Sequence, residues 1–107
     1  MKKRAKHLQM IAREQAAASW AYALRIREAF PEVVQGLRET APLSMHELQQ
    51  RSQVQRETVS QIEDGGRMSN LFTIARIAFV LAGNLTEFAR QLDAWQPGGG
   101  RQKRQAN

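Results

Sequence analysis

Residues 43–65 read LSMHELQQRSQVQRETVSQIEDG. Within this stretch, Ser44 is followed three residues later by Glu47, which is the capping-box pattern. In a capping box, the serine hydroxyl and the glutamate carboxylate satisfy backbone N–H groups at the start of a helix. The pattern therefore predicts a short helix that begins after Ser44 and ends near Arg51, and a tight turn at 52–54.

A second short helix is predicted from about Arg56 to Glu63, because the Asp-Gly-Gly sequence at 64–66 is a strong stop signal. The side chains of the two helices divide into two sets. An apolar set is spaced so that it locks the helices together: Leu48, Val54, Val59 and Ile62. A polar set points outward: Gln55, Arg56, Glu57, Ser60 and Gln61. Such a pair is typical of DNA-reading proteins, in which the second helix enters the major groove.

The chain before this pair also predicts helix. Residues 5–29 contain no Gly or Pro and are rich in good helix formers, so they predict one long helix, and a break near 17–19 stays open. Pro31 suits the first turn of a new helix, since its missing N–H is not needed there. That short helix is expected to end near Thr40, before Pro42.

The chain after the pair predicts two more helices. Apolar residues recur on one face of 70–81, and Gly83-Asn84 interrupts the pattern. A last helix is expected at 87–95, with Thr86 as its cap. No stretch favours a strand, so the sequence predicts an all-α protein.

Charge divides the chain into three segments. A basic, mostly helical N-terminal extension at 1–30 carries a net charge of +5, a helix–turn–helix domain at 31–96 carries −2, and a disordered basic tail at 97–107 carries +3. The total of +6 favours an anionic partner such as double-stranded DNA. We therefore interpret the basic residues at both ends as phosphate-binding arms: Lys2, Lys3, Arg4, Lys6, Arg101, Lys103 and Arg104.

The run from Leu43 to Leu81 resembles the helix–turn–helix of the Cro/cI-type (XRE-type) repressor family. The matching residues are Leu43, Ser44, Glu47 and Leu48 in the first helix, Val54, Thr58, Val59, Ser60, Ile62, Glu63 and Gly65 in the second, and Leu71, Ile74, Ile77, Ala78 and Leu81 in the helix that follows. The resemblance implies a five-helix repressor-like DNA-binding domain, here with an additional long N-terminal helix.

The resemblance also implies roles for individual residues. Base contacts fall on Arg56, Glu57 and Gln61, because arginine can read guanine and glutamine can read adenine. Contacts to the DNA backbone fall on Ser44, Met45, His46, Gln55, Thr58, Ser60, Arg67 and Asn70. A structural ion pair would join Arg38 to Glu63.

Two residues depart from the family pattern. Gln49 stands where the family has alanine, at the crossing of the two helices, so its long side chain is expected to bend outward. Gln53 stands where the family has glycine, at a turn position that often needs a positive φ. The angle between the two helices is therefore expected to differ from that of the family.

These observations predict a sequence-specific repressor that binds a (pseudo)palindromic operator as a homodimer, with phage- or plasmid-type regulation. The alternative is an antitoxin that represses its own operon and also binds a toxin protein. A third possibility is a domain that keeps the fold for protein binding only. The dimer surface is expected either on the N-terminal helix, through Trp20, Tyr22, Leu24, Ile26 and Phe30, or on the last helix, through Phe88, Leu92 and Trp95.

Other functions find little support in the sequence. The chain has no cysteine, and its two histidines, His7 and His46, have no partner at metal-ligand spacing. No nucleophile motif is present, so we expect no enzyme activity, and we expect no metal, cofactor or small-molecule ligand. No apolar run reaches 18 residues and no signal peptide is recognisable, so a cytoplasmic protein without a membrane partner is expected.

Overall fold

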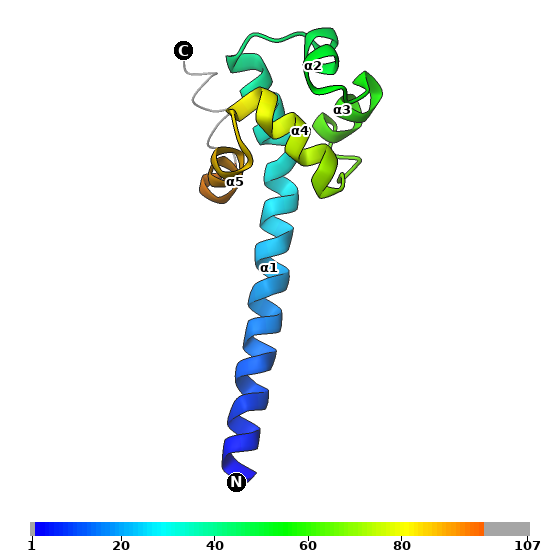
Figure 1. Cartoon of the computed structure of the whole chain (residues 1–107). Coiled ribbons are helices and arrows are strands. Elements are labelled where there is room, and N and C mark those ends of the chain that lie inside the picture. Colours follow the sequence, from blue (N-terminus) through cyan, green and yellow to red (C-terminus); the bar gives the residue numbers. More distant parts are fainter. Residues whose placement is uncertain (1, 98–107) are drawn as a thin grey trace.

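The computed structural model describes residues 2–97, with side chains from Gln9 onward. These residues form five α-helices and no strand, which confirms the all-α prediction. The helices are α1 (Lys2–Thr40), α2 (Met45–Ser52), α3 (Arg56–Glu63), α4 (Leu71–Ala82) and α5 (Leu85–Ala94). Figure 1 shows α1 as a long rod whose C-terminal part is packed among the four shorter helices. We call residues 24–97, which comprise the C-terminal part of α1 and the four shorter helices, the helical head.

The long helix α1 runs without a break through every position where the sequence suggested one. The possible interruption near 17–19 is not seen, and the prediction that Pro31 begins a new helix is wrong, because Pro31 lies inside α1. Proline cannot donate a hydrogen bond to the carbonyl four residues earlier, so the helix lacks one bond at this point. Phe30 and Val34, on either side of the proline, are fully buried and hold the helix in place. The expected additional helix is therefore the N-terminal part of α1 itself.

The core of the helical head is formed by side chains from all five helices. Phe30 of α1 and Phe88 of α5 meet edge to face, with ring centroids 6.1 Å apart and ring planes at 88°. This is the geometry that aromatic rings prefer in protein interiors. The other buried apolar residues are Ala29, Val33, Val34, Leu43, Leu48, Val54, Val59, Ile62, Ile77, Ala78 and Leu81. Leu92 and Trp95 are partly buried against this core.

Side-chain caps define where the shorter helices begin. The capping box is present, since the Glu47 N–H donates to the Ser44 hydroxyl at 3.1 Å and the Ser44 N–H donates to the Glu47 carboxylate at 3.3 Å. Asn84, and not Thr86, caps α5, because its side-chain oxygen accepts from the Glu87 N–H at 2.7 Å. Gly83 ends α4 with a φ of 89°, a conformation that glycine adopts without strain.

A polar cluster fastens the end of α5 to α1. The Arg25 guanidinium donates to the carbonyl oxygens of Asp93 and Trp95, at 2.9 and 3.3 Å, where the C-terminal end of α5 leaves carbonyls without helical partners. The Tyr22 hydroxyl donates to the Asp93 carboxylate at 2.8 Å. A further Arg25 N–H donates to the same carboxylate at 3.1 Å. These side-chain hydrogen bonds to the carboxylate, from Tyr22 and then Arg25, hold the pKa of Asp93 below its ordinary value. The cluster therefore marks the border between the helical head and the rest of α1.

The N-terminal part of α1 projects away from the helical head. All side chains from Gln9 to Ala23 are exposed, and Figure 1 shows this part of the helix extending alone. At about 1.5 Å per residue, a helix of 39 residues is about 58 Å long, and the longest dimension of the molecule is 61 Å. We call residues 9–23 the projecting segment.

Candidate nucleic-acid interface

The helix α3 has one face in the core and one face outside. Val59 and Ile62 are fully buried, and they fix the inner face of the helix. The three residues assigned to base contacts, Arg56, Glu57 and Gln61, are all exposed. The periodicity of the sequence therefore separated the inner from the outer residues of this helix.

The first turn of α3 is capped from the neighbouring helix. Gln55 occupies the N-cap position, but its own side chain makes no capping hydrogen bond. The Gln49 side-chain oxygen from α2 accepts a hydrogen bond from the Arg56 backbone N–H at 2.9 Å. The expectation that Gln49 bends outward is wrong, because this half-buried side chain turns toward the start of α3. No sequence signal for this role exists, since the partners are separated by a turn.

The turn between α2 and α3 uses an unusual backbone conformation. Gln53 has φ 61° and ψ 23°, and it is the only residue other than glycine with a positive φ among residues 2–97. This agrees with the expectation that the position requires a positive φ. The preceding hydroxyl, on buried Ser52, donates to the Leu48 carbonyl at 2.6 Å and accepts from the Val54 N–H at 3.1 Å. The turn is thus held by hydrogen bonds on both sides of Gln53.

The residues assigned to DNA backbone contacts lie on both helices of the pair and beyond them. At the start of α2, Ser44 and His46 are exposed, whereas Met45 is half-buried and packs against the core. Because Ser44 and Glu47 form the capping box, the hydroxyl of Ser44 is already bonded within the helix. On and before α3, Gln55 is exposed, and Thr58 and Ser60 are half-buried.

The segment between α3 and α4 places Arg67, a candidate for a DNA backbone contact, beside Gln61, a candidate for a base contact. An Arg67 guanidinium N–H donates to the Gln61 side-chain oxygen at 3.2 Å. Asn70 serves as the N-cap of α4, because its side-chain oxygen accepts from the Thr73 N–H at 2.9 Å. Arg67 therefore lies beside the outer face of α3, while the oxygen of Asn70 is engaged in a structural bond.

Arg38 and Glu63 form the ion pair that the resemblance implied. Two guanidinium nitrogens of Arg38 donate to the two carboxylate oxygens of Glu63, at 2.7 and 2.9 Å, and a third N–H donates to the Leu43 carbonyl at 3.1 Å. The side chains are only 17% and 6% exposed. The hydrogen bond to Glu63 raises the pKa of Arg38 above its ordinary value. This pair ties α3 to the end of α1.

The structure describes only the N-terminal of the two basic arms, and that one in part. Lys2, Lys3, Arg4 and Lys6 belong to the first turns of α1, where the structure describes the backbone alone. Arg101, Lys103 and Arg104 fall outside the described residues.

Among the residues that the structure describes, no cluster of three or more His, Cys, Asp or Glu side chains could hold a metal ion. Within the same part of the chain, no single helix has the length and apolar character needed to cross a membrane, and only the α4–α5 pair, bent by 89°, reaches that length and composition when its two helices are taken together.

Comparison with known proteins yields no match for this chain among protein-family models, curated protein sequences or solved structures.

Proposed function

We propose that this chain is a sequence-specific DNA-binding repressor that acts as a homodimer on a (pseudo)palindromic operator. The observation that carries the proposal is the two-sided structure of α3. Val59 and Ile62 anchor the helix, while Arg56, Glu57 and Gln61 form a polar outer face. A short helix with a fixed inner face and a polar outer face suits the major groove, where each base pair offers a distinct set of donors and acceptors.

The chemistry of the outer face favours reading of specific bases. Arginine donates two hydrogen bonds to guanine, and glutamine forms a donor–acceptor pair with adenine. The bond from Arg67 to the Gln61 oxygen orients the Gln61 amide and leaves its NH2 group free to donate. The oxygen keeps a second lone pair, so both adenine contacts stay available to Gln61. Preorganised side chains of this kind favour specificity, because less freedom is lost on binding.

The charge distribution favours separate regions for general attraction to DNA and for the reading of bases. The 31–96 segment has a net charge of −2, so it provides little general attraction for a polyanion. The basic residues at both ends of the chain would supply that attraction, and backbone N–H groups at the start of α2 would bind one phosphate. Affinity for all DNA should therefore fall steeply with salt, whereas base preference should depend on α3.

The burial pattern favours α1 as the dimer surface. The aromatic rings of Phe30 and Phe88 are used in the core of one chain, so they are not free for a partner. Trp20 is 69% exposed and Tyr22 is 53% exposed, and both lie on the projecting segment. An isolated helix of this length is marginal in water, so it gains stability when its apolar residues pair with a second copy. Dimers also suit palindromic sites, because one such helix pair contacts few bases.

The experiment that tests the proposal is selection of bound sequences from a random pool of double-stranded DNA. The expected result is one enriched motif with two-fold symmetry. Arg56→Ala and Gln61→Ala should each lose preference at one position of each half-site while general DNA binding persists. Arg90→Ala serves as the control, because Arg90 is exposed on α5 and pairs with Glu87 there. An unenriched pool, or a motif unchanged by both α3 variants, would refute the proposal.

A further inference from the structure

The outer face of α4 is apolar although it faces solvent. Phe72 and Phe79 are each 71% exposed, and Leu71, beside Phe72, is 66% exposed. The opposite face of the same helix already supplies Ile77 and Leu81 to the core. Neither exposed phenylalanine is therefore needed to hold α4 in the fold. Clustered apolar surface of this kind typically marks an interaction site.

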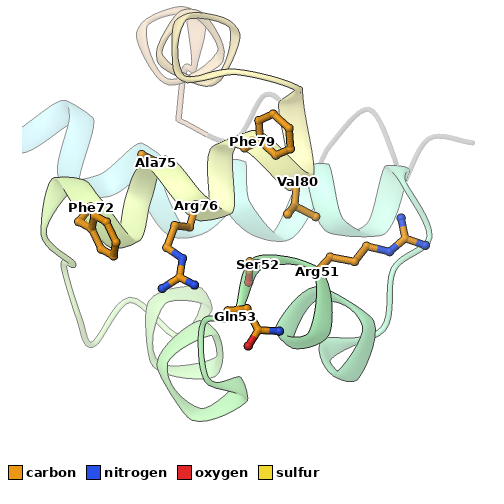
Figure 2. A pocket seen from close by; sticks show the side chains of 8 residues that line it. All are labelled: Arg51, Ser52, Gln53, Phe72, Ala75, Arg76, Phe79 and Val80. Carbon is orange, nitrogen blue, oxygen red and sulfur yellow. The ribbon is translucent and has the colours of Figure 1, made fainter.

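A groove lies beside these rings, between α4 and the C-terminal end of α2. Its volume is about 360 Å³. We call it the α2–α4 groove and define it by Phe72, Ala75, Arg76, Phe79 and Val80 of α4 together with Arg51 of α2. Figure 2 shows Arg76 extending from α4 toward the turn at Gln53, with Arg51 on the α2 side. The groove thus combines an apolar wall with two positive charges.

Among the residues that the structure describes, Arg76 makes no ion pair with a carboxylate, and Arg51 makes only one, at long distance. The Arg76 guanidinium lies over the ring of Phe72, with its Cζ atom 5.3 Å from the ring centroid. Arg51 has one loose ion pair, in which its nitrogen is 3.9 Å from a carboxylate oxygen of half-buried Glu47. Both guanidinium groups therefore have donors left for an acidic ligand.

The charges argue against another part of this chain as the occupant. The segment 1–30 carries +5 and the segment 97–107 carries +3, so both would be repelled by Arg51 and Arg76. A second copy of α4 is also disfavoured. Phe72, Arg76 and Phe79 follow one stripe of the helix, so a two-fold pairing of these stripes would bring the two Arg76 side chains close to the axis.

We propose that the α2–α4 groove is a docking site for an acidic amphipathic segment of a second protein. Apolar side chains of that segment would cover Phe72 and Phe79, which are about 10 Å apart along the helix axis at 1.5 Å per residue. Its carboxylates would bind Arg51 and Arg76. Because the groove residues lie on α2 and α4, and the proposed base contacts lie on α3, the two functions can be tested separately.

The test is a selection of random 16-residue peptides displayed against the full chain. We expect the enriched peptides to carry an excess of Asp and Glu together with two apolar residues one or two helical turns apart. Their affinity, measured by fluorescence anisotropy, should fall at least tenfold on Phe79→Ser and on Arg76→Glu. Leu85→Ser and Arg90→Glu are matched controls on α5 and should leave the affinity unchanged. Phe79, Leu85 and Arg90 are exposed and Arg76 is half-buried, and none of the four belongs to the core, so all four variants should fold, which circular dichroism would verify.

Three results would overturn this proposal. One is a selection that yields no peptide dependent on Phe79, or that yields basic or neutral peptides. Another is a loss of self-association by Phe79→Ser in sedimentation, which would assign the groove to a second copy. The third is a loss of affinity for random-sequence DNA by Arg51→Glu and Arg76→Glu with no effect on peptides, which would assign the arginines to phosphate.

Discussion

The side-chain oxygen of Gln49 lies 2.9 Å from the backbone nitrogen of Arg56 and accepts its hydrogen bond. The first N–H groups of a helix have no partner within the helix, and the N-cap residue commonly satisfies one of them. In α3 the N-cap residue Gln55 does not do so, and a residue of α2 takes its place. A single side chain therefore both caps α3 and fixes its start relative to α2.

This bond predicts a measurable loss of stability in Gln49→Ala. We expect the free energy of unfolding to fall by about 1 kcal/mol, the usual effect of removing a cap. Urea unfolding at a fixed protein concentration measures it. Gln50→Ala is the matched control, because Gln50 is the next residue on the same helix and is exposed; its change should stay within about 0.5 kcal/mol. Equal stability of the two variants would show that the bond contributes nothing.

The left-handed backbone at Gln53 predicts that glycine stabilises the turn. At a φ of 61°, the Cβ atom of an L-residue costs about 1 kcal/mol or more. Gln53→Gly and Gln53→Ala both remove the side-chain bond to the Gln50 carbonyl, so their difference isolates the Cβ atom. We expect the glycine variant to be the more stable of the two by about 0.5–1 kcal/mol in thermal unfolding, after allowance for the added freedom of the unfolded chain. An alanine variant as stable as the glycine variant would contradict the strain.

The ion pair between Arg38 and Glu63 predicts a large effect from removing one partner. Because both side chains are mostly buried, Arg38→Met leaves the Glu63 carboxylate without a counter-charge, and we expect a loss of about 2–4 kcal/mol. The exposed pair of Arg90 with Glu87 is the comparison, and Arg90→Met should cost far less, because solvent screens an exposed pair. The double variant Arg38→Met, Glu63→Met should be more stable than Arg38→Met alone. Additive losses would mean that the two side chains are not coupled.

The cluster at Asp93 predicts how stability changes with pH. Since the folded pKa of Asp93 is lowered from 3.8, its contribution is present above pH 3.8 and is lost as the pH falls through the lowered value. The pKa of Tyr22 is raised from 10.0 by its hydrogen bond to Asp93, so its contribution is present below pH 10 and is lost at higher pH. Asp93→Asn should therefore flatten the dependence of Tm on pH at both ends. Tyr22→Phe should flatten the alkaline end more than the acidic one, and unchanged profiles would contradict this account.

Sequence reasoning succeeded where the deciding signals are local. The capping box lies at the start of α2 and the Asp-Gly-Gly stop directly follows α3, so the start of α2 and the end of α3 could be predicted. It failed at Pro31, because the packing of Phe30 and Val34 against distant helices outweighs the local preference of proline. The sequence also predicts Thr86 as the cap of the last helix, but the N-cap of α5 is Asn84, directly after Gly83, the C-cap of α4.

Local sequence spacing likewise predicts the outer face of α3 but not the α2–α4 groove. The outer residues of α3 follow from the spacing of Val59 and Ile62, which marks the inner face. The α2–α4 groove does not follow from spacing, because Phe72 and Phe79 are seven residues apart, as core residues of a helix often are. Only the packing of α4 shows that the two rings face outward.

The projecting segment predicts that folding and self-association can be separated by truncation. A chain that begins at Ala21 keeps Tyr22, Arg25 and the whole core, and it lacks Trp20. Because the side chains of 9–20 are exposed, we expect the truncated chain to keep its cooperative unfolding, with a Tm within a few degrees of the full chain when both are monomeric.

In sedimentation at micromolar concentration, the full chain should be a dimer and the truncated chain a monomer. The single substitution Trp20→Arg, in the full chain, should weaken the dimer in the same way. A truncated chain that still dimerises would move the interface to the helical head, and a truncated chain that fails to unfold cooperatively would show that the projecting segment supports the core.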